Sequence, residues 1–233
     1  MTKRKKRYRL RLWVVVFLFV LFASLFIGGT YYVFHWGQDG QNNEKLQKEL
    51  EEMADIVEVD DNTIHLPDNE VLVNPSPDKE SDYYYYIKVP FMQVDFSKLK
   101  EKNSDTVGYI KVNNTNINYP VVYSGDNTYY LTHAFDKTKN SAGWVFLDYR
   151  NNLDDLSDNT VIYGHGRVDN TVFGSLKKVL TTSWQENKDN YIIRISSPRY
   201  NYVYQIFSIY TIEAESYYIM TTFETDEAKQ AWI

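Results

Sequence analysis

Cysteine is absent from this chain of 233 residues. Disulfide bonds therefore contribute nothing to its stability, and thiolate metal ligands are excluded. The four histidines are scattered, without the short spacings that zinc sites use, so we predict no metal site and no cofactor; they are His35, His65, His133 and His165. The G-x-S-x-G elbow of a serine hydrolase is missing as well, which argues against a Ser-His-Asp enzyme.

Acidic residues are missing from the first eleven positions, which carry seven lysines and arginines. The other 222 residues contain 18 basic and 31 acidic side chains. A main domain with this acidic balance is unsuited to a polyanion, so we predict no nucleic-acid partner. The basic cluster at 1–11 needs a local explanation.

Charged residues are also absent from 12–34, "LWVVVFLFVLFASLFIGGTYYVF". These residues would span roughly 34 Å as a helix, which is enough to cross a bilayer. Basic residues before the span and acidic sequence after it predict a single-pass anchor with a cytoplasmic tail at 1–11 and an extracellular main domain. A cleaved secretory signal is the alternative. The apolar run exceeds the usual ~7–15 residues and no A-x-A site follows, so we predict an uncleaved anchor in the cell membrane.

Residues 35–82 follow the anchor and form the predicted stalk and linker. Within them, 42–57 has apolar residues at helical spacing and predicts an amphipathic stalk helix. The stretch 58–82 contains three prolines and many acids, which is typical of a linker or an extended wrap. The "YYYY" run at 83–86 could stack on sugars, although a half-buried edge strand explains it more simply.

The folded domain is predicted to begin near Tyr83 and to be mostly β. A short helix is expected at 95–105 and helical pieces at 126–135 and 172–180. Short runs rich in β-branched and aromatic residues alternate with Asn, Asp, Ser and Gly: "TVGYIKV", "NINYPVV", "AGWVFLDY", "NTVIYGH", "YIIRIS" and "YVYQIFSIYTIE". No internal repeat is present. This pattern predicts a closed, mostly antiparallel barrel or a sandwich, with a last helix that Thr225 caps.

His165 stands at the end of one of these runs, in "YGHG". A strand-end imidazole between two glycines leaves room for a ligand to approach. By itself the pattern suits a structural histidine, a metal ligand or a general acid–base.

The order and spacing of five motifs over roughly 92–233 resemble those of the class B sortases, membrane-anchored cysteine transpeptidases of Gram-positive bacteria. The motifs are "SDTVGYIKV", "INYPVVYSGDNTYYLTHAF", "AGWVFLDYRNN", "SDNTVIYGHGRVDNTVFGSL" and "YVYQIFSIY". The resemblance implies a sortase-type β-barrel over 83–233 with short helices. It also implies cleavage of a C-terminal sorting signal of a surface protein and transfer of the new carboxyl end to a peptidoglycan or pilin amine.

The resemblance places the family's acid–base histidine at His165 and lines the substrate groove with Asn118 and Val122. In the family a cysteine thiolate attacks the substrate carbonyl and an arginine stabilises the oxyanion. Gly166 departs from the family, which usually has Asn after the histidine. The cysteine and arginine of the family follow the helix that begins at Thr225, so we expect a chain that stops before both and is inactive by itself.

Two explanations fit the sequence. The chain is a truncated class B sortase domain, or it is a non-catalytic membrane-anchored β-domain that binds peptide or cell-wall glycan. In either case, four arginines that precede the expected nucleophile do not replace the family's oxyanion-stabilising arginine. We predict that they lie at the surface or in turns: Arg150, Arg167, Arg194 and Arg199.

Overall fold

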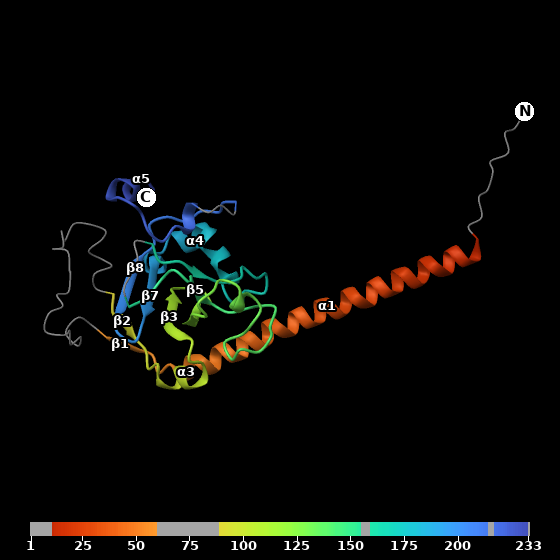
Figure 1. Ribbon diagram of the computed structural model, residues 1–233, viewed down its shortest axis with the longest axis horizontal. Helices are drawn as coiled ribbons and strands as arrows, with labels where there is room; N and C mark the ends of the chain where they lie inside the picture. Colours follow the sequence, from red (N-terminus) through yellow and green to blue (C-terminus); the bar gives the residue numbers. More distant parts are fainter. Residues whose placement is uncertain (1–10, 60–88, 155–158, 214–216, 233) are drawn as a thin grey trace, which may run out of the picture. The chain divides into compact units, whose positions relative to one another are not determined.

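The computed structural model describes residues 11–59, 89–154, 159–213 and 217–232 (Figure 1). The chain divides into two compact units, residues 1–39 and 40–233. The predicted "YYYY" strand and most of the predicted linker lie outside the described residues. Outside the sheets, the described elements are α1 Leu12–Met53, α3 Ser97–Lys102, η1 Tyr129–Leu131, η2 Gly174–Leu180, α4 Thr182–Gln185, η3 Lys188–Tyr191, η4 Tyr217–Ile219 and α5 Asp226–Trp232.

Helix α1 is continuous over 42 residues. Its apolar part is long and apolar enough to cross a membrane, as judged by length and composition. The amphipathic helix predicted from residue 42 is confirmed, but it ends at Met53 rather than at 57. Asp55 turns the chain with a positive φ of 41°, and β1 begins two residues later. Leu50 and Ala54 are fully buried and belong to the hydrophobic core of the 40–233 unit.

The principal sheet of the second unit has six strands in the order β6-β5-β4-β3-β7-β8. Neighbouring strands are antiparallel except for the parallel pair β4–β5. A separate two-stranded sheet joins β1 and β2. The strand bounds are β1 Val57–Val59, β2 Phe91–Gln93, β3 Thr106–Val112, β4 Asn118–Val122, β5 Phe146–Leu147, β6 Ile162–Tyr163, β7 Ile192–Ser196 and β8 Asn201–Gln205. Within the described residues the sheet is thus an open half-barrel, with β6 and β8 at its edges.

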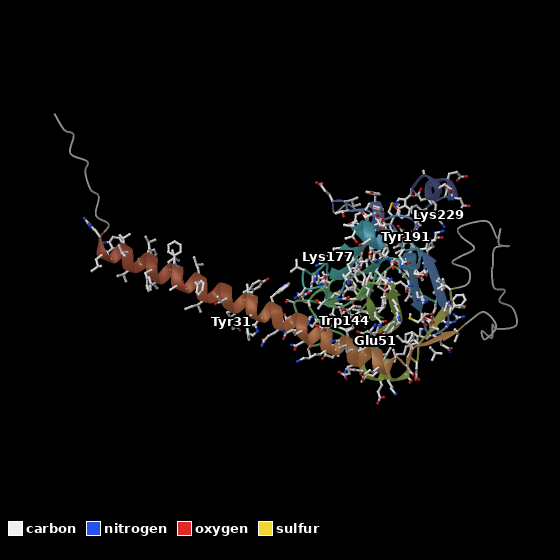
Figure 2. All side chains as sticks on the ribbon, turned by 180° about the vertical axis from the view of Figure 1, so that it is seen from behind. Tyr31, Glu51, Trp144, Lys177, Tyr191 and Lys229 are labelled. Carbon is white, nitrogen blue, oxygen red and sulfur yellow. The ribbon has the colours of Figure 1, made fainter. Side chains whose placement is uncertain are left out.

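Aromatic side chains fill the core beside β4. Trp144 is fully buried, and its indole N–H donates to the Pro120 carbonyl at 2.9 Å (Figure 2). Its ring meets Tyr119 edge to face, with centroids 5.2 Å apart, and lies 5.7 Å from Phe135. Edge-to-face pairs of this kind add to the stabilisation from burial. This cluster fixes β4 against the loops that lead to the candidate site.

Several predicted elements are shorter than the sequence suggests. The run "YVYQIFSIYTIE" forms a strand only to Gln205, which pairs with Ile192 at the start of β7. One further backbone bond follows, from the Ile206 N–H to the Tyr191 carbonyl at 2.9 Å. Phe207 lies two residues after Gln205 and is 87% exposed. The helix expected at 126–135 is one 3₁₀ turn, η1, and the one expected at 172–180 is the 3₁₀ segment η2. The predicted cap of the last helix is confirmed, since the Ala228 N–H donates to the Thr225 hydroxyl at 3.1 Å.

Candidate functional site

His165 lies just past the end of β6, and its two flanking glycines have different surroundings. A Cβ at Gly164 would come within 2.8 Å of the Phe173 ring, so a side chain there has no room. A Cβ at Gly166 would meet no atom within 4 Å. The open side of the turn at Gly166 is consistent with the predicted approach of a ligand to the imidazole.

The imidazole of His165 is oriented by a backbone carbonyl. Its Nε2 lies 2.8 Å from the Leu131 oxygen at the end of η1. A carbonyl oxygen only accepts, so Nε2 must carry the proton and donate it. This bond leaves Nδ1 as the ring nitrogen that is available to exchange a proton with a reacting group.

The turn after His165 is closed by backbone bonds and an ion pair. The His165 carbonyl accepts from the Phe173 N–H at 3.0 Å. Arg167 is 7% exposed and donates to Asp169 at 2.7 Å, while the N–H and hydroxyl of Thr171 also donate to Asp169. Burial alone would raise the pKa of Asp169, but these hydrogen bonds outweigh it and lower that pKa. The turn is therefore held in one geometry.

An apolar cavity of about 720 Å³ adjoins this turn through Phe173, whose ring also contacts Gly164. Its walls come from the sheet, from η2 and from α5 and the segment before it. The lining residues are Ile110, Val112, Ile117, Leu153, Asn159, Thr160, Ile162, Phe173, Leu176, Ile193, Ile195, Tyr204, Phe207, Phe223, Lys229 and Trp232. An apolar cavity with a few polar groups at its edge is typical of a ligand site.

The two predicted groove residues occupy opposite ends of β4. Asn118 lines a polar cavity of about 570 Å³ together with residues 169–171 of the loop that follows His165. Its side-chain oxygen is buried without a hydrogen-bond partner in the described structure. Val122 is fully buried in the core, and its N–H donates to the Val145 carbonyl. The structure therefore brings Asn118, but not Val122, near the loop after His165; substrate contact by either residue stays a prediction.

The prediction that the four arginines lie at the surface or in turns is wrong for one of them. Arg194 is 8% exposed in the middle of β7, where it donates to the Pro90 carbonyl and the Asn113 side chain. Its guanidinium joins β7 to the neighbouring loops. The Pro90 carbonyl oxygen and the Asn113 side-chain oxygen both accept from it, so the buried guanidinium is hydrogen-bonded. Arg199 instead lies over the Tyr200 ring at the turn between β7 and β8.

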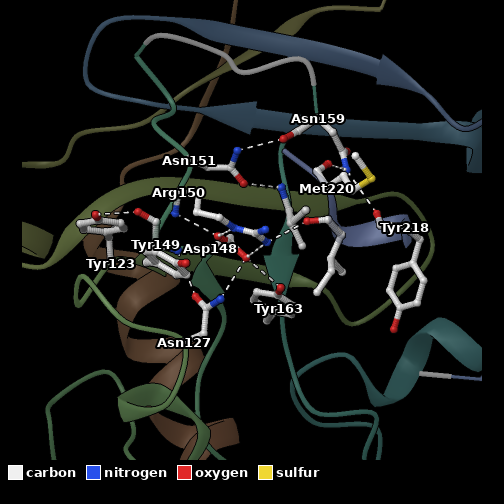
Figure 3. Close-up of polar contacts among 12 residues, drawn as sticks. Tyr123, Asn127, Asp148, Tyr149, Arg150, Asn151, Asn159, Tyr163, Tyr218 and Met220 are labelled. Carbon is white, nitrogen blue, oxygen red and sulfur yellow. Dashed lines mark hydrogen bonds and ion pairs between the residues drawn. The ribbon is translucent and has the colours of Figure 1, made fainter. Parts of the chain in front are cut away.

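A polar network at the end of β5 was not anticipated from the sequence (Figure 3). Asp148 has no exposed side-chain surface and accepts from Arg150, from the Tyr163 hydroxyl at 2.8 Å and from the Asn127 amide at 2.9 Å. Arg150 also donates to the Ile219 carbonyl at 2.7 Å. The network joins β5, β6 and the 217–221 segment, and it includes Tyr163, the last residue of β6, two residues before His165.

The electrostatics of this network hold its charges in place. Burial would raise the pKa of Asp148, but the hydrogen bonds from Arg150, Tyr163 and Asn127 outweigh it and keep that pKa well below its usual value. Burial, with the adjoining carboxylate, raises the pKa of Tyr163 to about 12. Asp148 is therefore an ionised anchor at neutral pH rather than a proton donor. In the described part of the chain, no group of three or more His, Asp or Glu residues is placed to hold a metal ion.

Comparison with known proteins finds a family whose members match more than half of the chain. A family model described as the sortase domain matches residues 110–231, which include His165. Sortase B of Staphylococcus aureus (strain NCTC 8325 / PS 47) is 37% identical over 138 residues, covering 59% of this chain and 56% of that protein. The chain spans about half the length of the curated relatives it matches.

Solved structures give the same family likeness. A Bacillus anthracis protein described as similar to sortase B matches with a TM-score of 0.63 and 28% identity, over 82% of this chain and 78% of that chain. A Staphylococcus aureus sortase B–substrate complex matches with a TM-score of 0.54 and 38% identity, over 59% of this chain and 62% of that chain. The open half-barrel with short helices is therefore a fold similar to that of the class B members.

Proposed function

The chain belongs to the sortase family, and we propose that it supplies the membrane anchor and the acid–base histidine of a class B sortase-type transpeptidase. The proposal rests on the His165 imidazole, which lies just past the end of β6 and is fixed through Nε2 to the Leu131 carbonyl at the end of η1. The open space at Gly166 and the apolar cavity beside Phe173 give a peptide room to approach it.

The geometry suits proton transfer through Nδ1. In sortase-type chemistry a thiolate attacks the carbonyl carbon of the substrate, and the C–N bond breaks to leave a thioester. The departing amine nitrogen needs a proton. His165, as the imidazolium, gives its Nδ1 proton to that nitrogen and becomes the neutral Nε2–H form that Leu131 holds. It then takes a proton on Nδ1 from the incoming amine, which attacks the thioester and releases the sulfur.

The 233 residues contain no cysteine, so they do not supply the sulfur of this reaction. We therefore expect these residues by themselves to turn over no substrate. The four arginines between residues 150 and 199 are engaged in other contacts: Arg150 with Asp148, Arg167 with Asp169, Arg194 with Pro90 and Asn113, and Arg199 with Tyr200.

The proposed partners follow from the same family membership. The donor is a surface protein that carries a C-terminal sorting signal, in keeping with the relative that was solved with substrate. The acceptor is an amine of peptidoglycan or of a pilin. The apolar part of α1, preceded by seven basic residues, supports a single-pass anchor with its N-terminus in the cytoplasm and the 40–233 unit outside the cell.

Peptide titration tests the proposal on the chain itself. A sorting-signal peptide added to the full chain in nanodiscs should shift the imidazole NMR signals of His165, while a fluorogenic version of the peptide should not be cleaved. Unchanged His165 signals at saturating peptide would contradict the assignment of the site, and cleavage that thiol reagents block would contradict the expected inactivity.

A second candidate function is a membrane-anchored binding module that holds peptide or glycan without chemistry. The lack of cysteine together with the apolar cavity favours it as the alternative. It predicts a peptide affinity that is the same in the His165→Ala variant, because the imidazole would then have no role in the site.

A further inference from the structure

We propose that Asn43 of helix α1 is a positioning residue for the His165 imidazole, an inference that rests on the proposed role of His165. Asn43 is fully buried, and both atoms of its amide are engaged. Its Nδ2 donates to the Gly143 carbonyl at 2.7 Å, and its Oδ1 accepts from the Asn140 amide at 3.0 Å. A buried amide of this kind is stable only when it is fully bonded, so these contacts fix the 140–143 loop against α1.

The 140–143 loop in turn holds the backbone that faces His165. The Asn140 N–H donates to the Thr132 carbonyl and the Trp144 N–H donates to the Tyr130 carbonyl, both at 2.9 Å. These two bonds flank Leu131 on either side. The carbonyl between them, that of Leu131, accepts from His165 Nε2.

Gly143 shows how closely the loop approaches this backbone. It has a positive φ of 59°, and a Cβ there would lie 2.5 Å from the Tyr130 oxygen and 2.9 Å from the Leu131 oxygen. Only glycine fits such a conformation at such a distance. A displacement of the 140–143 loop would therefore move the acceptor of the His165 bond as well.

The same face of α1 also contacts the turn that carries His165. Gly40 lies three residues before Asn43, and a Cβ at Gly40 would collide with the Asp169 carboxylate and approach Arg167 at 3.2 Å. Residues three apart in a helix lie on one face. One helical turn thus braces both the loop behind the acceptor carbonyl and the loop that follows the imidazole, which fixes His165 as the Nε2–H tautomer and directs Nδ1 to the reacting atoms.

The test is imidazole NMR on the full ¹⁵N-labelled chain in nanodiscs, with the His165 signals assigned through a His165→Gln variant. We compare Asn43→Ala, Asn43→Asp and the control Gln47→Ala. Gln47 lies one turn further along α1 and donates to the carbonyls of Asn116 and Asn118, away from the Leu131 backbone. Asn43→Asp keeps the side-chain volume and the bond from Asn140 but loses the donation to Gly143.

We expect the wild type and Gln47→Ala to show one neutral tautomer with a protonated Nε2. In Asn43→Ala both tautomers should appear, and the Nε2 proton should exchange with water roughly tenfold faster. Asn43→Asp should show the same change, because its second carboxylate oxygen would face the Gly143 carbonyl without donating to it, and it decides the outcome if Asn43→Ala does not fold. A wild-type His165 spectrum in the folded Asn43 variants, or an equal change in Gln47→Ala, would overturn the proposal.

This readout needs no turnover, so its result is separate from that of the proposed function. If His165 proves dispensable for catalysis, the tautomer measurement still reports whether Asn43 orients the ring. If the tautomer is unaffected in the Asn43 variants, Asn43 does not orient the ring, and the acid–base role of His165 is tested by the activity measurement alone.

Discussion

Gly166 and Gly174 lie at the two ends of the turn that presents His165, and they differ in the space around them. A Cβ at Gly174 would collide with the Arg167 carbonyl, whereas one at Gly166 would enter open space. We predict that Gly174→Ala lowers the free energy of unfolding by on the order of 2 kcal/mol, because the backbone must shift. Gly166→Asn, which installs the residue usual in the family, should change it by less than about 0.5 kcal/mol.

Urea unfolding of the full chain, followed by tryptophan fluorescence, gives the free energy of unfolding for both variants and the wild type. Equal losses for the two substitutions would show that the turn is not packed as described. A large loss for Gly166→Asn would mean that the space beside the imidazole is not open to a ligand.

Asp148 makes stability depend on pH in a defined direction. Its pKa in the folded chain is held below the usual value of about 3.9. The stabilisation is therefore complete above the unfolded pKa and is lost as the pH falls through it toward the folded pKa, between about pH 5 and pH 2. We predict that Asp148→Asn is less stable than the wild type at pH 6 and that the difference shrinks as the pH falls through this window.

Denaturant titrations of both proteins at several pH values measure this difference. Comparing the two proteins removes the contribution of other carboxylates with lowered pKa, such as Asp126 and Asp169. A difference that stays constant down to pH 2 would show that folding does not lower the pKa of Asp148.

At the level of single residues, the sequence identified the donor of the central hydrogen bond but not its acceptor. His165 is visible because it ends an apolar run between two glycines inside a family motif. The Leu131 oxygen is a backbone atom and has no sequence signature. Asn43 was missed as well, because its partner Gly143 is 100 residues away and nothing local in the stalk sequence indicates that contact.

At the level of secondary-structure elements, the 217–221 segment is held through its backbone carbonyls, which accept hydrogen bonds from Asn159. The Asn159 side-chain amide donates to the carbonyls of Tyr218 and Met220, and the Asn159 backbone N–H donates to the Thr221 carbonyl at 3.4 Å. We predict that Asn159→Ala raises amide hydrogen exchange in 217–221 by roughly tenfold and leaves β3 unchanged, since two side-chain bonds are lost at one place.

Asn152→Ala is the matched control, because the Asn152 side chain accepts only the local Asp154 N–H among the bonds described for it. Hydrogen-exchange mass spectrometry resolves both segments. Equal amide exchange rates for residues 217–221 in the two variants would show that Asn159 does not hold this segment in place.

The sequence predicted correctly the length of a strand that has partners on both sides, and it overestimated the length of strands with fewer partners. The run "TVGYIKV" is β3 from end to end because it has partners on both sides, β4 and β7. The runs "AGWVFLDY" and "NTVIYGH" give only the two-residue strands β5 and β6. Residue composition predicts that a segment can form a strand, but the partner strand decides how far the pairing extends.

At the scale of the molecule, the open sheet leaves an apolar cavity between the sheet and the segments that face it. We predict that the chain in nanodiscs binds an apolar fluorescent dye and that Leu176→Asp lowers this binding several-fold. Leu176 lines the cavity and is 37% exposed. A charge at its position places a hydrated group in the apolar wall, which opposes dye binding.

Leu180→Asp serves as the control, since Leu180 belongs to the same 3₁₀ segment, is 54% exposed and does not line the cavity. Dye fluorescence corrected for an empty-nanodisc blank gives the comparison. An equal loss in both variants would show that the dye binds the η2 surface rather than the cavity.

We propose His165 as the acid–base group of a reaction whose sulfur lies outside these 233 residues. The most direct measurement is cleavage of a fluorogenic sorting peptide by a chimera in which this chain is followed by the part of Staphylococcus aureus sortase B that carries the family's cysteine and arginine strands. We predict cleavage that thiol reagents block and that His165→Ala reduces at least about 100-fold. A folded His165→Ala chimera that cleaves within a few-fold of its parent would show that His165 is not the acid–base group.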